Sequence, residues 1–293
     1  QVGSTIKPFL YTLAMQEGYS PCYKVANVPY TFPVNDSIWK PKNSGPSDYD
    51  GEMVRLKWGL AHSVNYISAW LIKQFNPQSV IDVMRKMGID SKIDPVPSIF
   101  LGTSDISLYE MVGAYSTFAN EGVYIKPQFV TRIEDRRGNV ISTFTPPERE
   151  AINEQTAYLM LNLLQSVVKE GTGIRLRYKY ELMNQIAGKT GTTQNQSDGW
   201  FMGITPNLVS GVWVGGENRS IHFKGIALGQ GANMALPIWA LYMKNVYEDD
   251  SLTPKVSSED KFKEPLNFNY SLDCEEYDRN KGGGNRDSQD DFF

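Results

Sequence analysis

The sequence predicts an α+β fold in which helices cover an antiparallel sheet. Before residue 186 the apolar side chains recur mostly at helical spacing, residues 186–216 have the texture of strands, and a last helical pattern covers 234–247. Helices and strands are therefore segregated along the chain instead of alternating, which is typical of α+β proteins. We expect a mainly helical subdomain beside the sheet.

The composition is that of a globular domain without a strongly charged partner. The chain has 293 residues, 41% of them hydrophobic and 21% charged, which is enough to build a core. Its net charge of −4 does not favour nucleic acid or an anionic membrane surface. No run approaches the roughly 18 apolar residues of a membrane span. Because helical patterning starts within a few residues of Gln1, we expect the chain to be part of a longer protein.

The first helices are predicted from apolar spacing. Residues 4–17 are apolar almost all round, as in a short buried helix, and Gly18 ends it. Residues 19–53 are rich in Pro, Asn, Asp and Tyr without a clear period, so an irregular segment is expected there. Residues 53–75 have the spacing of one continuous helix. Its apolar positions are Leu56, Leu60, Val64, Ile67, Leu71 and Ile72.

Capping residues mark the next helices. Asn76 and Pro77 open a helix that ends near Gly88, with Asn76 at the cap and Pro77 at the first helical position. Ser107 and Glu110 form a capping box before the next helix. Asn153 opens a helix that continues through Val168.

Strands, one helix and a tail complete the chain. Apolar and polar residues alternate in 123–133 and in 139–144. These two stretches flank Arg136–Asn139, which predicts a hairpin. Three strands are expected at 186–193, 199–204 and 208–216, followed by the helix at 234–247. From 251 to 293 the composition turns charged and polar, so we divide the chain into a domain over 1–250 and a flexible tail over 251–293.

Ser4 and Lys7 provide the chemistry of acyl transfer at the start of the first helix. Their three-residue spacing puts both side chains on one helical face. A serine hydroxyl needs a base to become a good nucleophile, and a lysine serves when burial or a second cation lowers its pKa. Gly3 lets the chain turn tightly into the helix. The same Ser-x-x-Lys pattern starts at Ser37 and Ser258, but neither opens a buried helix, so we take both as accidental.

Two further motifs follow. Ser63 and Asn65 form the only Ser-x-Asn in the chain, which taken alone indicates no more than a polar notch on a helix. Lys189, Thr190 and Gly191 form the only Lys-Thr-Gly, within a strand-like run rich in small residues. Glycine in a strand often marks the close approach of a ligand. A lysine beside threonine hydroxyls suits a carboxylate ligand, although an edge-strand lysine would give the same pattern.

The three motifs together resemble a known family. Their order, with gaps of 59 and 126 residues, is that of the penicillin-interacting serine enzymes. The stretches VGSTIKPFLY, DPVPSIFLGTSDISLYEMVGAYSTFANEGVYIKP and AGKTGTTQNQSDGWFMGITPNLVSGVWVGG resemble the transpeptidase domain of a class A penicillin-binding protein. The resemblance covers roughly residues 1–247. It implies the penicillin-binding/serine β-lactamase-like fold, with the family's N-terminal strands missing from this chain.

The resemblance implies a role for each motif residue. Ser4 would attack the D-alanyl-D-alanine bond of a peptidoglycan stem peptide, and Lys7 would take its proton. Ser63 would relay a proton to the leaving group, and Asn65 would bond Lys7 and the substrate amide. The implied catalytic residues are Ser4, Lys7, Ser63, Asn65 and Lys189, and the implied substrate-binding residues are Thr190, Gly191, Thr192 and Thr193.

Two sets of groups would bind negative charge, one on the substrate carboxylate and one on the oxyanion. Lys189 would keep Lys7 neutral and attract the substrate carboxylate, which the hydroxyls of Thr190 and Thr192 would bind. The backbone N–H groups of Ser4 and Thr192 would form the oxyanion hole.

The resemblance also implies substrates, partners and a location. An amine of a neighbouring stem peptide would accept the acyl group and form a cross-link, and a carboxypeptidase side activity would accompany it. β-Lactams would acylate Ser4. No cofactor, metal or nucleic acid is expected. A membrane anchor and a glycosyltransferase domain would lie upstream, and the domain would work at the extracytoplasmic face of the bacterial cytoplasmic membrane.

Two alternatives share the motifs. A β-lactamase would need a base that activates water for deacylation, and Glu170 and Glu181 precede Lys189 without forming a convincing loop motif. A penicillin-binding sensor domain would be acylated once and signal. The only histidines, His62 and His222, give little material for a metal site or a His-based triad; His62 is adjacent to Ser63 and so faces away from it on a helix.

Cys22 and Cys274 are the only cysteines. Two cysteines are too few for a disulfide framework or a cysteine metal site. We therefore expect two unrelated free thiols, from which no cellular compartment can be inferred.

Overall fold

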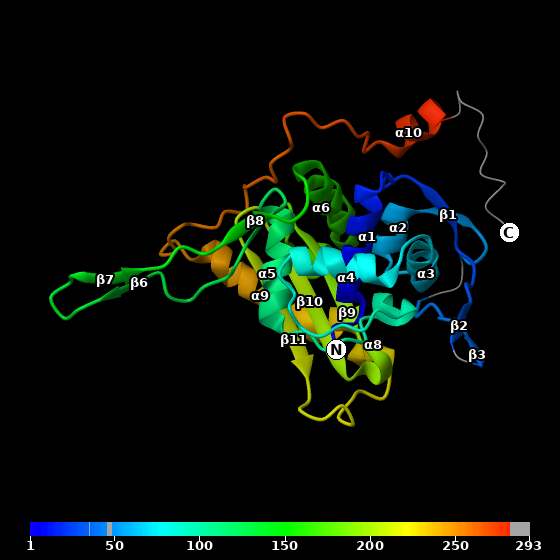
Figure 1. Ribbon diagram of the computed structural model, residues 1–293, viewed down its shortest axis with the longest axis horizontal. Coiled ribbons are helices and arrows are strands. Elements are labelled where there is room, and N and C mark those ends of the chain that lie inside the picture. Colours follow the sequence, from blue (N-terminus) through cyan, green and yellow to red (C-terminus); the bar gives the residue numbers. More distant parts are fainter. Residues whose placement is uncertain (35, 46–48, 282–293) are drawn as a thin grey trace.

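The computed structural model describes residues 1–34, 36–45 and 49–281 (Figure 1). A mixed structure of helices and antiparallel strands results, which confirms the predicted fold class. The 3-10 helix η1 (Gly3–Ile6) runs directly into α1 (Lys7–Gln16), which is buried along almost its whole length. Among the described residues no helix is both long and apolar enough to cross a bilayer.

The central sheet has the strand order β11-β10-β9, and every neighbouring pair is antiparallel. The strands are β9 (Ala187–Thr192), β10 (Asp198–Ile204) and β11 (Val209–Gly215), as the sequence predicted to within a residue or two. Every residue of β10 is buried, because the sheet is covered on both faces.

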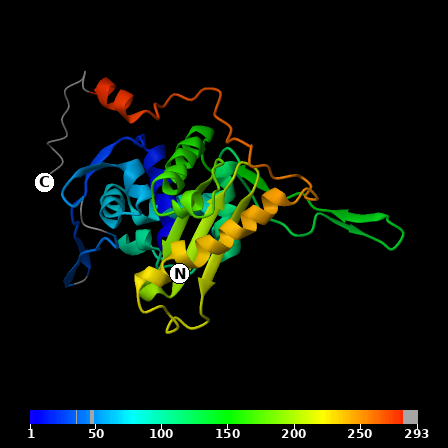
Figure 2. The ribbon, with the colours of Figure 1, turned by 180° about the vertical axis from the view of Figure 1, so that it is seen from behind.

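Two apolar clusters lie on the two faces of the sheet. On one face Phe201 packs against Trp239 of α9 (Gly231–Glu248), which crosses the strands in the view from behind (Figure 2). On the other face Trp200 and Met202 join the larger cluster, which contains α1, α5 (Leu108–Ala119) and α6 (Glu154–Lys169). Alternate residues of β10 thus enter different cores, as the period of a strand requires.

The helix predicted over 53–75 is broken into three pieces. The structure has β4 (Met53–Arg55), α2 (Leu56–Ala61) and α3 (Asn65–Gln74), with a turn at residues 62–64. Apolar spacing continues through the turn, so periodicity alone could not reveal it. A contact from a distant loop accompanies the break: the side-chain oxygen of Asn43 accepts the backbone N–H groups of Asn65 and Tyr66, and so caps the start of α3.

The capping predictions are confirmed. The Asn76 side chain accepts the N–H of Gln78 at the start of α4 (Pro77–Lys86). Ser107 and Glu110 form the reciprocal capping box of α5. Asn153 caps α6 through the N–H of Thr156.

The expected irregular segment contains three short strands. β1 (Lys24–Ala26) pairs with β4, and β2 (Phe32–Val34) pairs with β3 (Ser37–Trp39). The shorter remaining helices are η2 (Pro97–Leu101), α7 (Arg175–Tyr178), η3 (Gln194–Gln196), α8 (Ile226–Gly229) and α10 (Cys274–Lys281).

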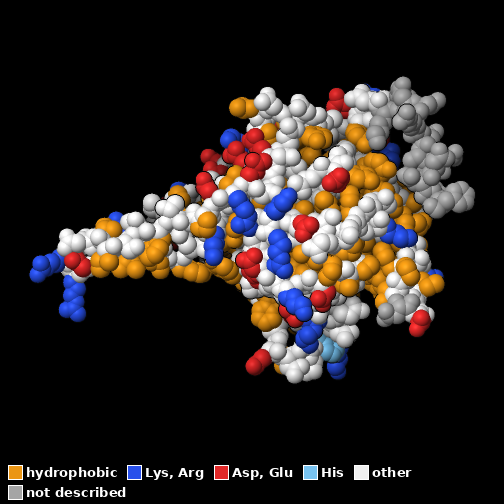
Figure 3. Space-filling model, in the orientation of Figure 1, with side chains coloured by type: hydrophobic (Ala, Val, Ile, Leu, Met, Phe, Trp, Pro, Cys, Tyr) orange, Lys and Arg blue, Asp and Glu red, His pale blue; other side chains and the backbone are white. Residues whose placement is uncertain are grey.

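A long arm projects from the body (Figures 1 and 3). Its tip is the predicted hairpin, β6 (Arg132–Glu134) with β7 (Val140–Thr143). The strand predicted over 123–133 is not continuous, because β5 (Val123–Ile125) pairs with β8 (Glu148–Glu150) at the base of the arm. The arm exposes the apolar residues Phe129, Val130, Ile133, Val140, Ile141 and Phe144.

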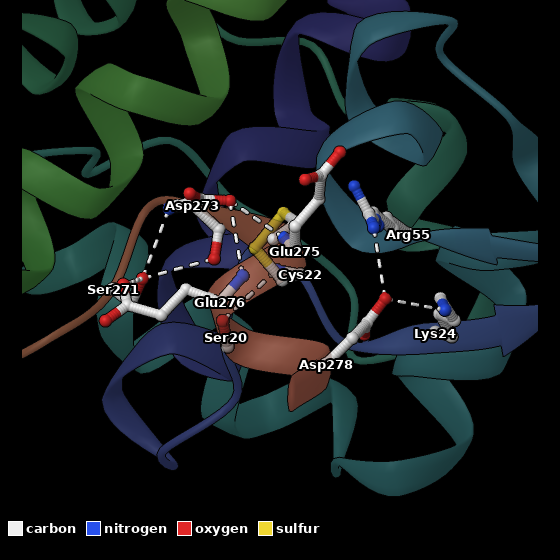
Figure 4. Close-up of a disulfide and its surroundings, with 10 residues drawn as sticks. Ser20, Cys22, Lys24, Arg55, Ser271, Asp273, Glu275, Glu276 and Asp278 are labelled. Atoms are coloured by element: carbon white, nitrogen blue, oxygen red, sulfur yellow. Dashed lines mark hydrogen bonds and ion pairs between the residues drawn. A yellow bond between two sulfur atoms is a disulfide. The ribbon is translucent and has the colours of Figure 1, made fainter. Parts of the chain in front are cut away.

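Cys22 and Cys274 form a disulfide, so the expectation of two free thiols is wrong (Figure 4). The two residues lie 252 positions apart, and sequence spacing gave no sign that the fold brings them together. Beside the disulfide, Asp278 of α10 forms ion pairs with Lys24 and Arg55, with N···O distances of 2.9 and 3.1 Å.

The disulfide also changes the description of the tail. Residues 251–273 form no helix or strand but run back across the body past α6 to α10 (Figures 1 and 2). Val256 and Phe262 are buried on the way, and the N–H of Phe262 donates to the Gln185 side chain. Residues 251–281 are thus connected to the body by buried side chains, a hydrogen bond and the disulfide, and their expected flexibility stays a prediction. The glycine run at 282–284 and the acidic end lie outside the described residues, and the domain boundary at 250 stays a prediction.

Replacing Cys274 by Ser should lower the free energy of unfolding by about 2–5 kcal/mol, because a cross-link over so long a loop removes much entropy from the unfolded chain. The measurement is urea unfolding of the variant and the oxidised wild type. Cys22→Ser/Cys274→Ser is the matched control and should unfold like the single variant. Identical midpoints for oxidised wild type and Cys274→Ser would show that the disulfide adds nothing to stability.

Candidate active site

The 3-10 helix η1, which carries Ser4, packs directly against the end of β9. Gly3 has a φ of +55°, and its N–H donates to the carbonyl of Gly102 at 3.0 Å. A side chain on Gly3 would place its Cβ 2.6 Å from the carbonyl oxygen of Thr192. Gly191 is equally constrained, since its Cβ would lie 2.8 Å from the carbonyl oxygen of Val2. These close approaches bring Ser4, which is half-buried on η1, beside the Lys-Thr-Gly strand.

Lys7 is fully buried at the first position of α1. Its Nζ lies 2.5 Å from the carbonyl oxygen of Ser63 and 2.7 Å from Oδ1 of Asn65. Burial, and then the neighbouring charge of Lys189, hold the pKa of Lys7 well below its usual range. A neutral amine has two N–H groups, and these two oxygens accept both. The nitrogen lone pair is then left to accept a proton.

Ser63 occupies the turn between α2 and α3 with a φ of +57°. Such a φ is uncommon for any residue with a side chain, and it often marks a functional site. The Ser63 hydroxyl lies 2.9 Å from Nζ of Lys189 and 3.4 Å from Nζ of Lys7. One hydroxyl therefore connects the first and third motifs, which are 182 residues apart.

Asn65 is held by both ends of its amide. Its Oδ1 accepts from Lys7, and its Nδ2 donates to the carbonyl of Lys42 at 2.6 Å. The backbone of Asn65 is fixed by the Asn43 side chain at 2.9 Å. Asn43 could not be predicted from sequence, because an asparagine in a segment without periodicity gives no signal of its own.

Lys189 is the second fully buried lysine of the site. It donates to Ser63 and to the carbonyl of Thr190 at 3.0 Å. Burial lowers its pKa to about 7. Near neutral pH this amine is therefore divided between its charged and neutral forms, which makes its charge sensitive to its surroundings.

The three threonines of β9 and its extension point to different partners. The Thr190 hydroxyl lies 2.6 Å from the hydroxyl of Thr172, and the Thr192 hydroxyl accepts the N–H of Gly231 at 3.0 Å. Thr193 instead donates to the buried carboxylate of Asp198 at 2.7 Å. The structure thus gives the Thr193 side chain a partner in the connection between β9 and β10, and its substrate-binding role stays a prediction.

Asp198 organises this end of the sheet and was also missed from sequence. Besides Thr193, its carboxylate accepts from Ser197 at 3.1 Å, from Trp213 Nε1 at 3.1 Å and from Arg219 at 2.8 Å. Burial acts to raise the pKa of this carboxyl, but the hydrogen bonds outweigh it and hold the pKa below its usual value.

The remaining candidates lie apart from this cluster. Ser37 and Ser258 are exposed, the first on β3 and the second beyond α9. His62 stacks on Trp58, with ring centroids 4.5 Å apart, and its Nδ1 lies 3.1 Å from the Trp58 carbonyl. Within the part of the chain that the structure describes, no group of three or more His, Cys, Asp or Glu side chains could hold a metal ion.

Comparison with known proteins finds relatives of this chain. The family model described as the penicillin binding protein transpeptidase domain matches residues 1–218. Penicillin-binding protein 1A of Aquifex aeolicus is 35% identical over 262 residues, which cover 87% of this chain and 35% of the relative. The chain thus spans about a third of the length of the curated relatives it matches.

Solved structures share the fold. The crystal structure of penicillin-binding protein 1A from Haemophilus influenzae aligns with a TM-score of 0.79 at 26% identity, covering 91% of this chain and 44% of that one. The PonA1 protein of Mycobacterium tuberculosis in complex with penicillin V aligns with a TM-score of 0.69 at 25% identity, covering 91% and 72%.

The lowered pKa of Lys189 predicts a pH dependence of stability. Between pH 7 and about 10.5 the unfolded chain holds a proton on this lysine that the folded chain has lost, so the free energy of unfolding rises with pH. Lys189→Met should reduce that rise by up to about 1.4 kcal/mol per pH unit. Urea unfolding at pH 7, 8 and 9 measures it, with Lys92→Met, at an exposed site, as control. Equal slopes in wild type and Lys189→Met would contradict the prediction.

Proposed function

The chain belongs to the penicillin-binding protein transpeptidase domain family, and on this premise we propose that it is the D,D-transpeptidase part of a larger peptidoglycan-synthesising protein. The observation that carries the proposal is the convergence of three distant motifs. Lys7, Ser63, Asn65 and Lys189 form one connected set of hydrogen bonds beside the turn that carries Ser4. This is an arrangement for a serine nucleophile with an amine base.

Acylation uses the neutral amine of Lys7. The lone pair of Lys7 takes the proton of the Ser4 hydroxyl as Ser4 Oγ attacks the penultimate D-alanine carbonyl of a stem peptide. The bond to the terminal D-alanine then breaks, and the Ser63 hydroxyl passes a proton to the leaving amine. Lys7 replaces the proton on Ser63, because both lie in one hydrogen-bonded set. The products are an ester on Ser4 and free D-alanine.

Deacylation repeats these steps in the reverse sense. The amine of a neighbouring stem peptide attacks the ester, gives up a proton to the same groups and forms the cross-link. Water in place of the amine gives a carboxypeptidase side reaction. A β-lactam presents a strained amide to Ser4 and forms the same kind of ester.

Two sites receive the negative charges of this reaction. The backbone N–H groups of Ser4 and Thr192 bind the oxyanion, a role supported by the close approach of Gly3 to Thr192. The hydroxyls of Thr190 and Thr192 bind the substrate carboxylate. Lys189, with a pKa of about 7, becomes protonated in response to that carboxylate.

The β-lactamase alternative has less support. Glu170 and Glu181, the carboxylates considered for activating water, are both exposed, Glu170 at the end of α6 and Glu181 in the segment after α7. A sensor domain is not distinguished by geometry, since it would need the same acylation machinery. The fate of the acyl group separates the three functions.

The disulfide supports an extracytoplasmic location, because disulfides persist mainly in oxidising compartments. The named relatives are about three times as long as the matched region, so a glycosyltransferase domain and a membrane anchor belong to the proposal for the whole protein.

Ser4→Ala should abolish covalent labelling by a fluorescent penicillin, because in the proposed mechanism Ser4 Oγ is the atom that attacks the β-lactam carbonyl. The matched controls are Ser37→Ala and Ser258→Ala, which remove the other two Ser-x-x-Lys serines and should label normally. Labelling is followed on gels, and the adduct is located by mass spectrometry. Full labelling of Ser4→Ala would refute the mechanism. Rapid loss of label from the wild type would favour a β-lactamase, and stable label without cross-linking of stem peptides would favour a sensor.

Lys189→Met should slow acylation by a penicillin by about tenfold to a hundredfold, the loss expected for one charge-assisted hydrogen bond. The second-order acylation rate and the thermal midpoint are measured on the same samples. A variant that folds normally and acylates at the wild-type rate would remove Lys189 from the substrate site.

A further inference from the structure

Thr172 lies in the active site although no sequence motif marked it. It follows α6 in the short segment Gly171–Gly173 and is half-buried. Its hydroxyl oxygen lies 2.6 Å from that of Thr190. The pair therefore joins a loop residue to the middle residue of the Lys-Thr-Gly motif.

The main chain fixes the position of Thr172. Its N–H donates at 3.0 Å to the carbonyl of Ala61, two residues before Ser63. A Cβ on Gly171 would lie 2.1 Å from the same carbonyl oxygen, so only glycine allows this approach. The backbone of Thr172 is thus fixed against the end of α2, directly before the turn that carries Ser63, and its short side chain places the hydroxyl beside Thr190.

Only one of the two hydroxyl protons can lie in the hydrogen bond between the Thr172 and Thr190 oxygens. If Thr190 donated to Thr172, its own proton would be used inside the protein and could not reach a ligand. If Thr172 donates, the Thr190 oxygen is satisfied as an acceptor and its proton is free to point at an anion. A chain of hydrogen bonds from Thr172 to Thr190 and on to the anion also polarises the Thr190 hydroxyl and strengthens its hydrogen bond to the anion.

Thr192 shows the same arrangement with a donor that cannot be reversed. Its hydroxyl oxygen accepts the backbone N–H of Gly231 at 3.0 Å, and a backbone N–H only donates. The Thr192 proton is therefore free as well. Both hydroxyl oxygens thus have a fixed partner behind them, which suits a pocket that donates two hydrogen bonds to a carboxylate.

We propose that Thr172 is a positioning residue that donates to Thr190 and so makes the Thr190 hydroxyl a dedicated donor to the carboxylate of the substrate or β-lactam. The inference rests on the proposed function, in which Thr190 binds that carboxylate. The loop after α6 would then help to select ligands that carry a carboxylate. Thr172 acts through Thr190 and does not itself contact the ligand.

The test compares a penicillin with its methyl ester, which lacks the negative charge. Acylation rates of Ser4 are measured for both in the intact protein by mass spectrometry. The wild type should prefer the free acid, and Thr172→Val should reduce that preference by about tenfold, the value of a hydrogen bond to a charged group. Thr172→Ser keeps the donor and should restore it. The ester should be acylated at nearly the same rate in all three proteins.

A structural defect would give a different result, since it would slow the acid and the ester alike. Thr117→Val is the matched control, because the Thr117 hydroxyl is buried with no hydrogen-bond partner among the described residues. Thr172→Ala serves if the valine does not fold.

The outcomes separate the inference from its premise. An unchanged acid preference in Thr172→Val would overturn the role of Thr172 while leaving the transpeptidase proposal intact. A wild type that acylates acid and ester equally would overturn the inference together with the carboxylate role of Thr190. Absence of acylation at Ser4 would overturn the proposed function itself.

Discussion

The hydroxyl of Ser63 lies between two fully buried lysine amines, and the site depends on this contact. Burial lowers the pKa of both amines, and for Lys7 the neighbouring charge of Lys189 lowers it further. The positive φ of Ser63 sets its hydroxyl in this position. The turn, the asparagine cap on α3 and the loop after α6 all serve to hold Ser63 there.

Much of the fold followed from the sequence because local signals were strong. The Asn76, Ser107 and Asn153 caps, the three strands of the sheet and α9 could each be placed from residues close by. The helix over 53–75 was predicted wrongly as continuous, because Asn43, which caps the start of α3, acts from a distant loop. The spacing of apolar residues along the chain carries no information about such a cap.

The motif residues were found by their order in the chain, whereas the residues around them were not. Thr172, Asp198 and Asn43 are common residue types without a distinctive spacing, and their roles arise only from tertiary contacts. The disulfide was missed for the same reason, since nothing local distinguishes Cys22 and Cys274 from free thiols. Local chemistry can be predicted from sequence, and support from distant segments requires the structure.

The Cys22–Cys274 bond closes a covalent ring that contains the exposed arm. A protease that cuts the arm at Arg136 or Arg137 would divide the polypeptide into two chains. One would carry Ser4 and Lys7, and the other would carry Lys189. The sulfur bridge would keep both chains in one molecule, and the buried contacts of the site lie far from the cut. A nicked protein would therefore keep its catalytic groups together until the bridge is reduced.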